Sequence, residues 1–116
     1  MGIVRHVLFL GRRDDVNAVM MAMDVFFMPS LYEGLPVVVV EAQASGLPCV
    51  VSENVPAPDI IGRLRILKLS DSNEKWVEAL VSQTALDRRQ VKEMVISGGY
   101  DICHEAMKLQ AFYLSV

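Results

Sequence analysis

An α/β fold, with a parallel sheet covered by helices on both faces, is what this 116-residue sequence predicts. Short runs of β-branched and aromatic residues alternate with helical stretches, and this order is typical of parallel sheets. The length suits one small domain with its own core. The composition is 53% hydrophobic, above the roughly 45 to 50% of an ordinary soluble domain. Part of the apolar surface is therefore expected to face another structure.

Four strands are expected from apolar runs bounded by turn residues. They are Val7 to Leu10, Asp24 to Met28, Pro48 to Ser52 and, with a weaker signal, Ile66 to Leu69. A helix capped by Asp14 or Asp15 is expected after the first strand. Its apolar stripe has the i, i+3, i+4, i+7 spacing of a core-facing helix and consists of Val16, Val19, Met20 and Met23.

The segment between the second and third strands carries conflicting signals. Its four consecutive valines, residues 37–40, favour a strand by propensity. Pro36 suits the first position of a helix, however, and Gly46 suits the position just past a helix end. We therefore expect a buried helix from Pro36 to Ser45, since tertiary packing overrides propensity.

The last third of the chain is expected to be helical after a loop over residues 53–59 that contains two prolines. Helix-start and helix-stop residues predict one helix from Asp71 or Ser72 through Trp76 and Leu80. A second is expected from about Leu86 to Ile96, ended by Gly98-Gly99, and a last from Asp101 to about Leu114. Trp76 is expected to anchor helix packing.

Two carboxylates, Glu33 and Glu41, are separated by seven residues around the start of the Pro36 helix. The simplest interpretation is that Glu33 is an acidic residue of a loop and that Glu41 is a solvent-exposed acidic residue of the helix. Glu33 follows the carboxyl end of a strand, however, where open parallel sheets bind their ligands. The helix start also directs backbone N–H groups into that crevice, where they can hold a diphosphate. Free donors are expected at Gly34, Leu35, Val37 and Val38.

The run from Gly11 to Ser52 resembles glycosyltransferase group 1, the family-four transferases of GT-B fold. Glu33 through Glu41 matches the E-x7-E motif of that family, and residues 100–116 resemble its closing helix. The resemblance implies a partial Rossmann-like domain, the carboxy-terminal part of the GT-B domain that binds the nucleotide-sugar. It also implies that the parent enzyme transfers a hexose from a nucleotide diphospho-sugar, expected to be a UDP-sugar, to a glycan or lipid-linked acceptor with retention of configuration.

The resemblance also implies roles for individual residues. Glu33, the expected catalytic residue, would bind hydroxyls of the donor hexose without acting as a nucleophile, and Glu41 would hold the ribose hydroxyls. Amides of the motif loop would contact sugar and phosphate, and Arg13 would lie near the nucleobase. Ionised carboxylates accept hydrogen bonds only and so suit vicinal hydroxyls. No metal or other cofactor is expected, because amides and cations stabilise the leaving diphosphate.

Elements of the family pattern are missing from the sequence. The glycine-rich loop, a basic pair for the diphosphate and the amino-terminal acceptor domain lie upstream in the family. We therefore expect residues 1–116 to form a single partial nucleotide-sugar-binding domain that lacks the acceptor domain and transfers no sugar alone. The alternative is a non-catalytic truncated module that binds nucleotide weakly or self-associates.

Charge and composition exclude other classes of protein. The net charge of -3 argues against nucleic-acid binding. Neither a membrane span nor a signal peptide is expected, so the chain is predicted to be cytoplasmic. Cys49 and Cys103 lack metal-type spacing and are expected to be reduced thiols, with Cys49 buried. His6 and His104 are expected to be surface or packing residues.

A homodimer is the expected assembly. By the resemblance, the strand at residues 7–10 becomes a sheet edge, and it lacks the lysines or prolines that protect natural edges from pairing. Pairing of this strand between two copies is the simplest arrangement, and exchange of a terminal helix is another.

Overall fold

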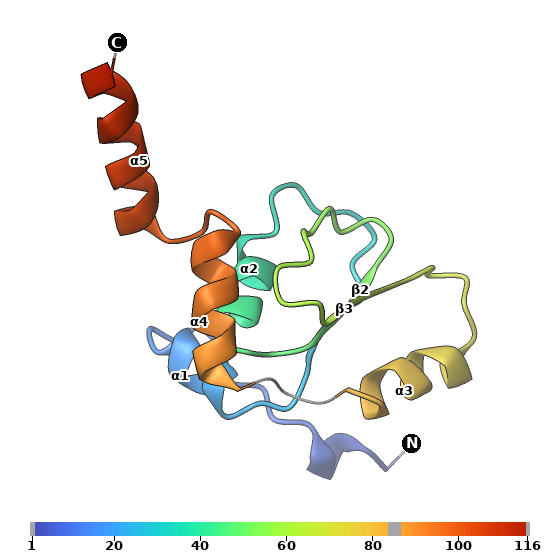
Figure 1. The fold of residues 1–116 in the computed structure, drawn as a ribbon. Coiled ribbons are helices and arrows are strands. Elements are labelled where there is room, and N and C mark those ends of the chain that lie inside the picture. The colour runs from blue at the N-terminus through green and yellow to red at the C-terminus, as the bar shows by residue number, and fades with distance from the viewer. Residues whose placement is uncertain (1, 84–86, 116) are drawn as a thin grey trace.

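A parallel three-stranded sheet forms the centre of the computed structural model, which describes residues 2–83 and 87–115 (Figure 1). The strand order is β1-β2-β3. The elements are η1 (Val4–His6), α1 (Val16–Met21), β1 (Phe26–Met28), α2 (Val37–Ala44), β2 (Cys49–Ser52), β3 (Leu64–Leu67), α3 (Asn73–Val81), α4 (Arg88–Ser97) and α5 (Ile102–Ser115). The predicted α/β fold is confirmed, and the sheet is consistent with part of a Rossmann-like domain.

The central strand β2 separates two apolar layers. All four of its residues are buried, and alternate side chains point to opposite faces of the sheet. Cys49 and Val51 pack with Met20 of α1 and with buried residues of α2. Val50 packs with Leu67 and with Ala79 of α3. The sheet therefore carries α1 and α2 on one face and α3 on the other.

Helix α2 forms despite its valines, as expected. Gly46 has a φ of 83°, the left-handed conformation that glycine adopts without strain. The Gly46 amide donates to Gln43, and the Leu47 amide donates to Ala42 at 3.0 Å, which is the Schellman ending of a helix. The expected burial is only partly confirmed, because Val39 is fully buried whereas Val37 is 52% exposed.

Gln43 ties α2 to the loop that precedes β3. Its side chain is fully buried. Its Nε2 donates to the Pro58 carbonyl at 2.8 Å, and its Oε1 accepts from the Ile60 amide at 2.7 Å. One side chain thus satisfies two backbone groups of a segment that has no regular secondary structure. Nothing in the local sequence around Gln43 predicts this role, because its partners lie 15 and 17 residues further along the chain.

The three carboxy-terminal helices begin at polar caps. Ser72 Oγ accepts from the Lys75 amide at 3.3 Å, and Asp87 accepts from the Arg89 amide at 2.8 Å. Asp101 accepts from the His104 amide at 2.7 Å at the start of α5. The predicted helix starts at Ser72 and Asp101 are confirmed, whereas the start expected at about Leu86 lies outside the described residues, and α4 is capped by Asp87.

Several element boundaries differ from the prediction. Strands β1 and β2 are shorter than expected, and β3 begins at Leu64 rather than Ile66 because its register sets Leu64 beside Cys49. Met23 lies beyond the end of α1 and is 41% exposed. Pairing with a neighbouring strand, rather than the extent of an apolar run, therefore fixes where these strands end.

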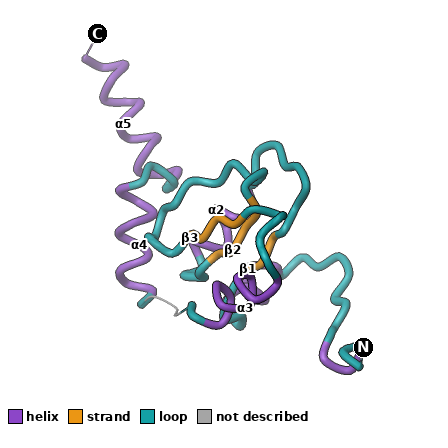
Figure 2. Tube along the Cα trace, turned by 90° about the vertical axis from the view of Figure 1, so that its right-hand side faces the viewer, coloured by secondary structure: helices purple, strands orange, loops and turns teal. Residues whose placement is uncertain are grey.

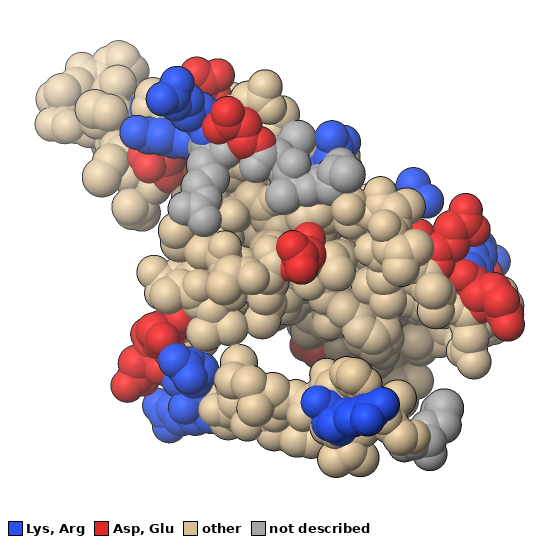
Figure 3. Space-filling view, turned by 90° about the horizontal axis from the view of Figure 1, so that it is seen from below, with Lys and Arg blue, Asp and Glu red and all other residues tan. Residues whose placement is uncertain are grey.

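The predicted strand at Val7 to Leu10 is wrong. These residues belong to an extended amino-terminal arm, residues 2–13, that runs away from the sheet (Figure 2). Leu8 is 80% and Phe9 is 92% exposed. A strand needs a hydrogen-bonded neighbour, and propensity does not supply one. Figure 3 shows open space between part of this arm and the body of the protein.

The chain is elongated because the arm and α5 both project from the body (Figures 1 and 2). Its radius of gyration is 16.7 Å, against about 13 Å for a compact domain of 100 residues. No residue of α5 is buried within the described part of the chain. No helix there is both long enough and apolar enough to span a membrane.

We expect Gln43→Leu to lower the free energy of unfolding by about 2 to 4 kcal/mol. The Pro58 carbonyl and the Ile60 amide would both lose their partner, and each unsatisfied buried group costs about 1 to 3 kcal/mol. Urea denaturation followed by circular dichroism measures the change. The matched control is Gln90→Leu on the exposed surface of α4, which should stay within about 0.5 kcal/mol of wild type. Equal stability of both variants would contradict the structural role of Gln43.

The two cysteines should react with thiol reagents at very different rates. Burial, with a smaller effect of the Asp59 carboxylate, raises the pKa of Cys49 to about 12, so its thiol stays protonated at pH 8. Cys103 is exposed. An aromatic disulfide reagent at pH 8 should therefore label one thiol quickly in the folded protein and both in urea, because the thiolate is the reactive form. Fast labelling of folded Cys103→Ser would refute this.

Candidate functional site

The candidate site lies at the carboxyl ends of β1 and β2. Ser52, the last residue of β2, is buried and its Oγ donates a short hydrogen bond to the Ser30 carbonyl. Ser30 Oγ in turn donates to Glu33 Oε1 at 2.9 Å. The end of the central strand thereby fixes the loop after β1, and the loop serine orients the half-buried Glu33.

The residues beside Glu33 are open to solvent. Leu31, Tyr32 and Leu35 are each more than 80% exposed. A Cβ atom placed on Gly34 would meet nothing within 4 Å. The loop from Leu31 to Leu35 therefore presents backbone at its surface and leaves room for a ligand to approach it.

Three of the four expected amide donors are unpaired at the start of α2. Among the described residues, no hydrogen bond joins the N–H groups of Gly34, Leu35 and Val38 to a protein acceptor. The Val37 amide, by contrast, donates to the Leu35 carbonyl at 2.9 Å. The expectation of a free donor at Val37 is wrong, because the chain turns tightly at Pro36 before it enters the helix.

Glu41 lies in different surroundings from Glu33. It is exposed on α2 and lines a groove of about 420 Å³ between α1 and α2. The other lining residues are Asp14, Val16, Asn17, Met20, Ala44 and Ser45. Glu33 is not among the described residues that line this groove.

The groove combines acidic and apolar walls. Glu41 and Asp14 supply carboxylates that accept hydrogen bonds from hydroxyl groups, and Asn17 both donates and accepts. Met20 forms an apolar floor. Asn17 was not predicted as a site residue, because the apolar spacing of this helix indicates core packing, and Asp14 was predicted only as a possible helix cap. They lie beside Glu41 because α1 contacts α2, and the local sequence does not predict that contact.

Arg13 is engaged with a neighbouring acid. Its Nε and Nη2 donate to the two oxygens of Asp15, both at 2.7 Å. The hydrogen bond to Arg13 keeps the pKa of Asp15 below its ordinary value, and the same bond raises the pKa of Arg13. Both groups therefore stay charged at neutral pH. Asp15 precedes α1 but does not cap it with its side chain, contrary to the prediction.

The histidines and cysteines do not form a second site. Cys49 is buried in the core, and Cys103 and His104 lie on the exposed surface of α5. Within residues 2–83 and 87–115, no group of three or more histidine, cysteine or acidic side chains is placed to hold a metal ion. The donor set of the site consists of carboxylates, hydroxyls and backbone amides, which suits a ligand rich in hydroxyl and phosphate groups.

Comparison with known proteins identifies the family. The model of the family described as glycosyl transferases group 1 matches residues 2–86. Over 104 residues the chain is 42% identical to EpsF of Bacillus subtilis (strain 168), whose name assigns it provisionally as a glycosyltransferase; the match covers 85% of this chain and 27% of EpsF.

A second relative is the Escherichia coli UDP-Gal:alpha-D-GlcNAc-diphosphoundecaprenol alpha-1,3-galactosyltransferase. It is 48% identical over 125 aligned residues, covering 100% of this chain and 32% of the enzyme. The chain thus spans about a quarter to a third of the length of these two relatives. The family match covers most of the chain, and the parallel sheet agrees with it: this chain belongs to the group 1 glycosyltransferases.

Proposed function

We propose that this chain binds the nucleotide diphospho-sugar, specifically a UDP-sugar, for a retaining hexosyltransferase reaction. The observation that carries the proposal is the hydrogen-bonded connection from Ser52 through the loop to Glu33. It holds a carboxylate beside unpaired amides at the carboxyl edge of a parallel sheet, where such sheets bind ligands. Family membership supports the same chemistry.

Glu33 is the proposed catalytic-site residue. Its Oε1 accepts from Ser30, which leaves Oε2 to accept hydrogen bonds from hexose hydroxyls. In this role Glu33 orients the donor and forms no covalent bond to it. The amides of Gly34, Leu35 and Val38 would stabilise negative charge on the leaving diphosphate, which is electrostatic preorganisation. Val37 would join them only if its bond to Leu35 opened.

Glu41 is proposed to bind the ribose from the groove between α1 and α2. Vicinal hydroxyls of a ribose match the acceptor oxygens of Glu41 and Asp14. Arg13 lies one residue before that groove and is proposed to contact the base, with Asp15 fixing its guanidinium group. A nucleotide in this position would run from α1 across the start of α2 towards Glu33.

The acceptor is proposed to be lipid-linked. The Escherichia coli relative is named for transfer to a diphosphoundecaprenol-linked sugar, and a Campylobacter jejuni relative, 45% identical over 47 residues, is named for transfer to another diphospho-undecaprenol substrate. A cytoplasmic location is part of the same proposal.

UDP and UDP-galactose should respond differently to variants of the two glutamates. If Glu41 binds ribose, Glu41→Ala should lower the affinity for both ligands about tenfold or more. This is the expected effect of losing one charge-assisted hydrogen bond. If Glu33 binds the hexose, Glu33→Ala should weaken UDP-galactose and leave UDP unchanged. Amide chemical shifts of Gly34, Leu35 and Val38 measure the binding.

Three further variants control this experiment. Glu93→Ala removes an exposed glutamate of α4 and should leave both affinities unchanged. Ser30→Ala should behave as a milder form of Glu33→Ala, and Ser30→Thr should retain binding, because the hydroxyl donor is kept. A titration in which UDP moves none of these amides, or in which Glu41→Ala binds UDP as well as wild type, would refute the proposed site.

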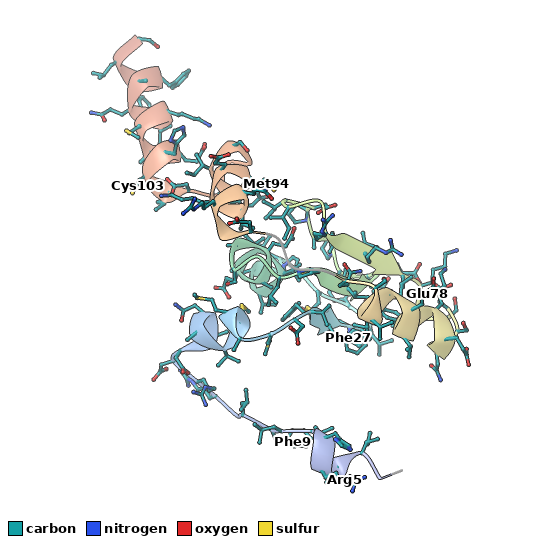
Figure 4. All side chains as sticks on the ribbon, turned by 60° about the horizontal axis from the view of Figure 1, so that its bottom comes forward. Arg5, Phe9, Phe27, Glu78, Met94 and Cys103 are labelled. Atoms are coloured by element: carbon teal, nitrogen blue, oxygen red, sulfur yellow. The ribbon has the colours of Figure 1, made fainter. Side chains whose placement is uncertain are left out.

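Self-association through the amino-terminal arm is the second part of the proposal. The arm is extended at Val7, and Phe9 points into solvent far from Phe27 of β1 (Figure 4). Strand β1 is hydrogen-bonded only to β2 in the described sheet, so its other edge is unpaired. Residues 7–10 of one copy therefore match the open edge of β1 in a second copy, and burying them would remove exposed apolar area.

Light scattering across a dilution series tests this assembly. We expect a dimer at micromolar concentration, and Leu8→Lys or Phe9→Lys should convert it to a monomer, because a buried lysine there would lose its hydration. Met107→Lys, on the exposed surface of α5, is the control and should leave the dimer intact. A wild-type monomer would exclude self-association, and dissociation by Met107→Lys alone would place the interface on α5.

A further inference from the structure

A polar cavity of about 260 Å³ lies near the amino end of β3, whereas the proposed donor site lies at the carboxyl ends of the strands. Its lining residues are Gly62, Arg63, Leu64, Arg65, Ser82 and Gln83. Arg63 and Leu64 stand at the amino end of β3, whereas Glu33 follows the carboxyl end of β1. Because the strands are parallel, these two ends lie on opposite edges of the sheet.

Two arginines share this cavity. Arg63 and Arg65 are two residues apart, so they lie on the same face of β3 as Leu67, which packs beneath α3. Where α3 ends, at Val81, the face is no longer covered by apolar side chains, and the guanidinium groups border Ser82 and Gln83 instead. The fold thereby places the positive charges of both arginines at the same polar cavity.

The arginine side chains lack protein partners that would explain their position. In the described parts of the chain, no carboxylate lies within ion-pair distance of Arg63 or Arg65. Nε of Arg63 is buried and has no hydrogen-bond acceptor, and Nη1 makes one long contact of 3.4 Å to the Gly62 carbonyl. A buried N–H of a charged group that has no acceptor lowers the stability of the fold. Such a donor is rare in folded proteins and therefore indicates a further partner.

The end of helix α3 does not supply that partner. Its carbonyl groups carry partial negative charge and attract cations. The Ala79 carbonyl, however, already accepts from Gln83 Nε2 at 2.8 Å and from Ser82 Oγ at 3.4 Å, and Glu78 accepts from the Ser82 amide. The helix end is thus capped by its own following residues, and the arginines remain available to an external acceptor.

We propose that Arg63 and Arg65 form an oxyanion site that binds a phosphate group between the start of β3 and the end of α3. A guanidinium group donates two parallel hydrogen bonds to oxyanions, which makes arginine the common phosphate ligand of this geometry. The phosphate would accept hydrogen bonds from the guanidinium groups of Arg63 and Arg65 and neutralise their two charges. Ser82 and Gln83 form the opposite wall. This site is independent of the donor site at Glu33.

Titration with inorganic phosphate tests the site. In ¹⁵N-labelled protein, sodium phosphate should shift the amides of Gly62, Arg63 and Ser82 in a saturable manner, and sodium chloride of equal ionic strength should not. Arg65→Met should weaken phosphate binding about tenfold or more, since one charge-assisted contact is lost. Arg65 is exposed, so this variant keeps the core intact. Arg63→Met should weaken binding further, and Arg89→Met on α4 should have no effect.

A second arm separates a soluble phosphate from a lipid headgroup. Cosedimentation with phosphatidylglycerol vesicles that is lost in Arg65→Met would assign the site to a headgroup phosphate. Shifts from free phosphate without cosedimentation would assign it to a soluble ligand. The proposal is overturned if neither probe binds, if chloride reproduces the shifts, or if Arg65→Met binds phosphate as wild type does. Shifts at Gly34 to Val38 report on the other site and do not bear on this result.

Discussion

Complete burial of β2 is the constraint from which the rest of the structure follows. Cys49, Val50 and Val51 have no exposed surface, so apolar side chains must cover both faces of this strand. A single small sheet can meet this demand only if helices pack on its two sides. The same strand ends in Ser52, a polar residue that follows the three apolar ones. Its hydroxyl donates a hydrogen bond to the Ser30 carbonyl in the loop after β1. Core packing and positioning of the site are therefore coupled at one residue.

The two edges of the sheet have opposite chemistry. After the carboxyl end of β1, the Glu33 carboxylate lies beside amides that have no protein acceptor among the described residues. At the amino ends of the strands, Arg63 and Arg65 line a polar cavity, and no carboxylate of the described residues forms an ion pair with either side chain. Parallel strands produce this separation, because they align all strand starts at one edge and all strand ends at the other. The two proposed sites therefore lie at opposite ends of the strands and do not overlap.

The body and its extensions differ in how they are held. Gln43, Ser52 and the two apolar clusters join segments that are distant in sequence. The amino-terminal arm and α5 have mostly local hydrogen bonds and large exposed apolar side chains. Their exposed surfaces agree with the high apolar content of the chain, which a body of this size cannot bury alone. Both extensions present surface of the kind that interfaces cover.

The sequence by itself determined the α/β class, the helix starts at Ser72 and Asp101, and the helical state of residues 37–44. These features depend on residues close together in the chain, such as Pro36 and Gly46, whose backbone preferences act locally. The run from Gly11 to Ser52, which contains the E-x7-E motif of Glu33 and Glu41, likewise indicated the family.

Only the tertiary structure decided which groups meet. Val7 to Leu10 has strand propensity but no neighbour, so it stays extended and exposed. The Val37 amide turns inward to Leu35, Gln43 reaches the Ile60 amide, and Arg63 borders the end of α3. Hydrogen bonding and burial between distant segments depend on how the layers pack, and local propensity carries no information about that packing.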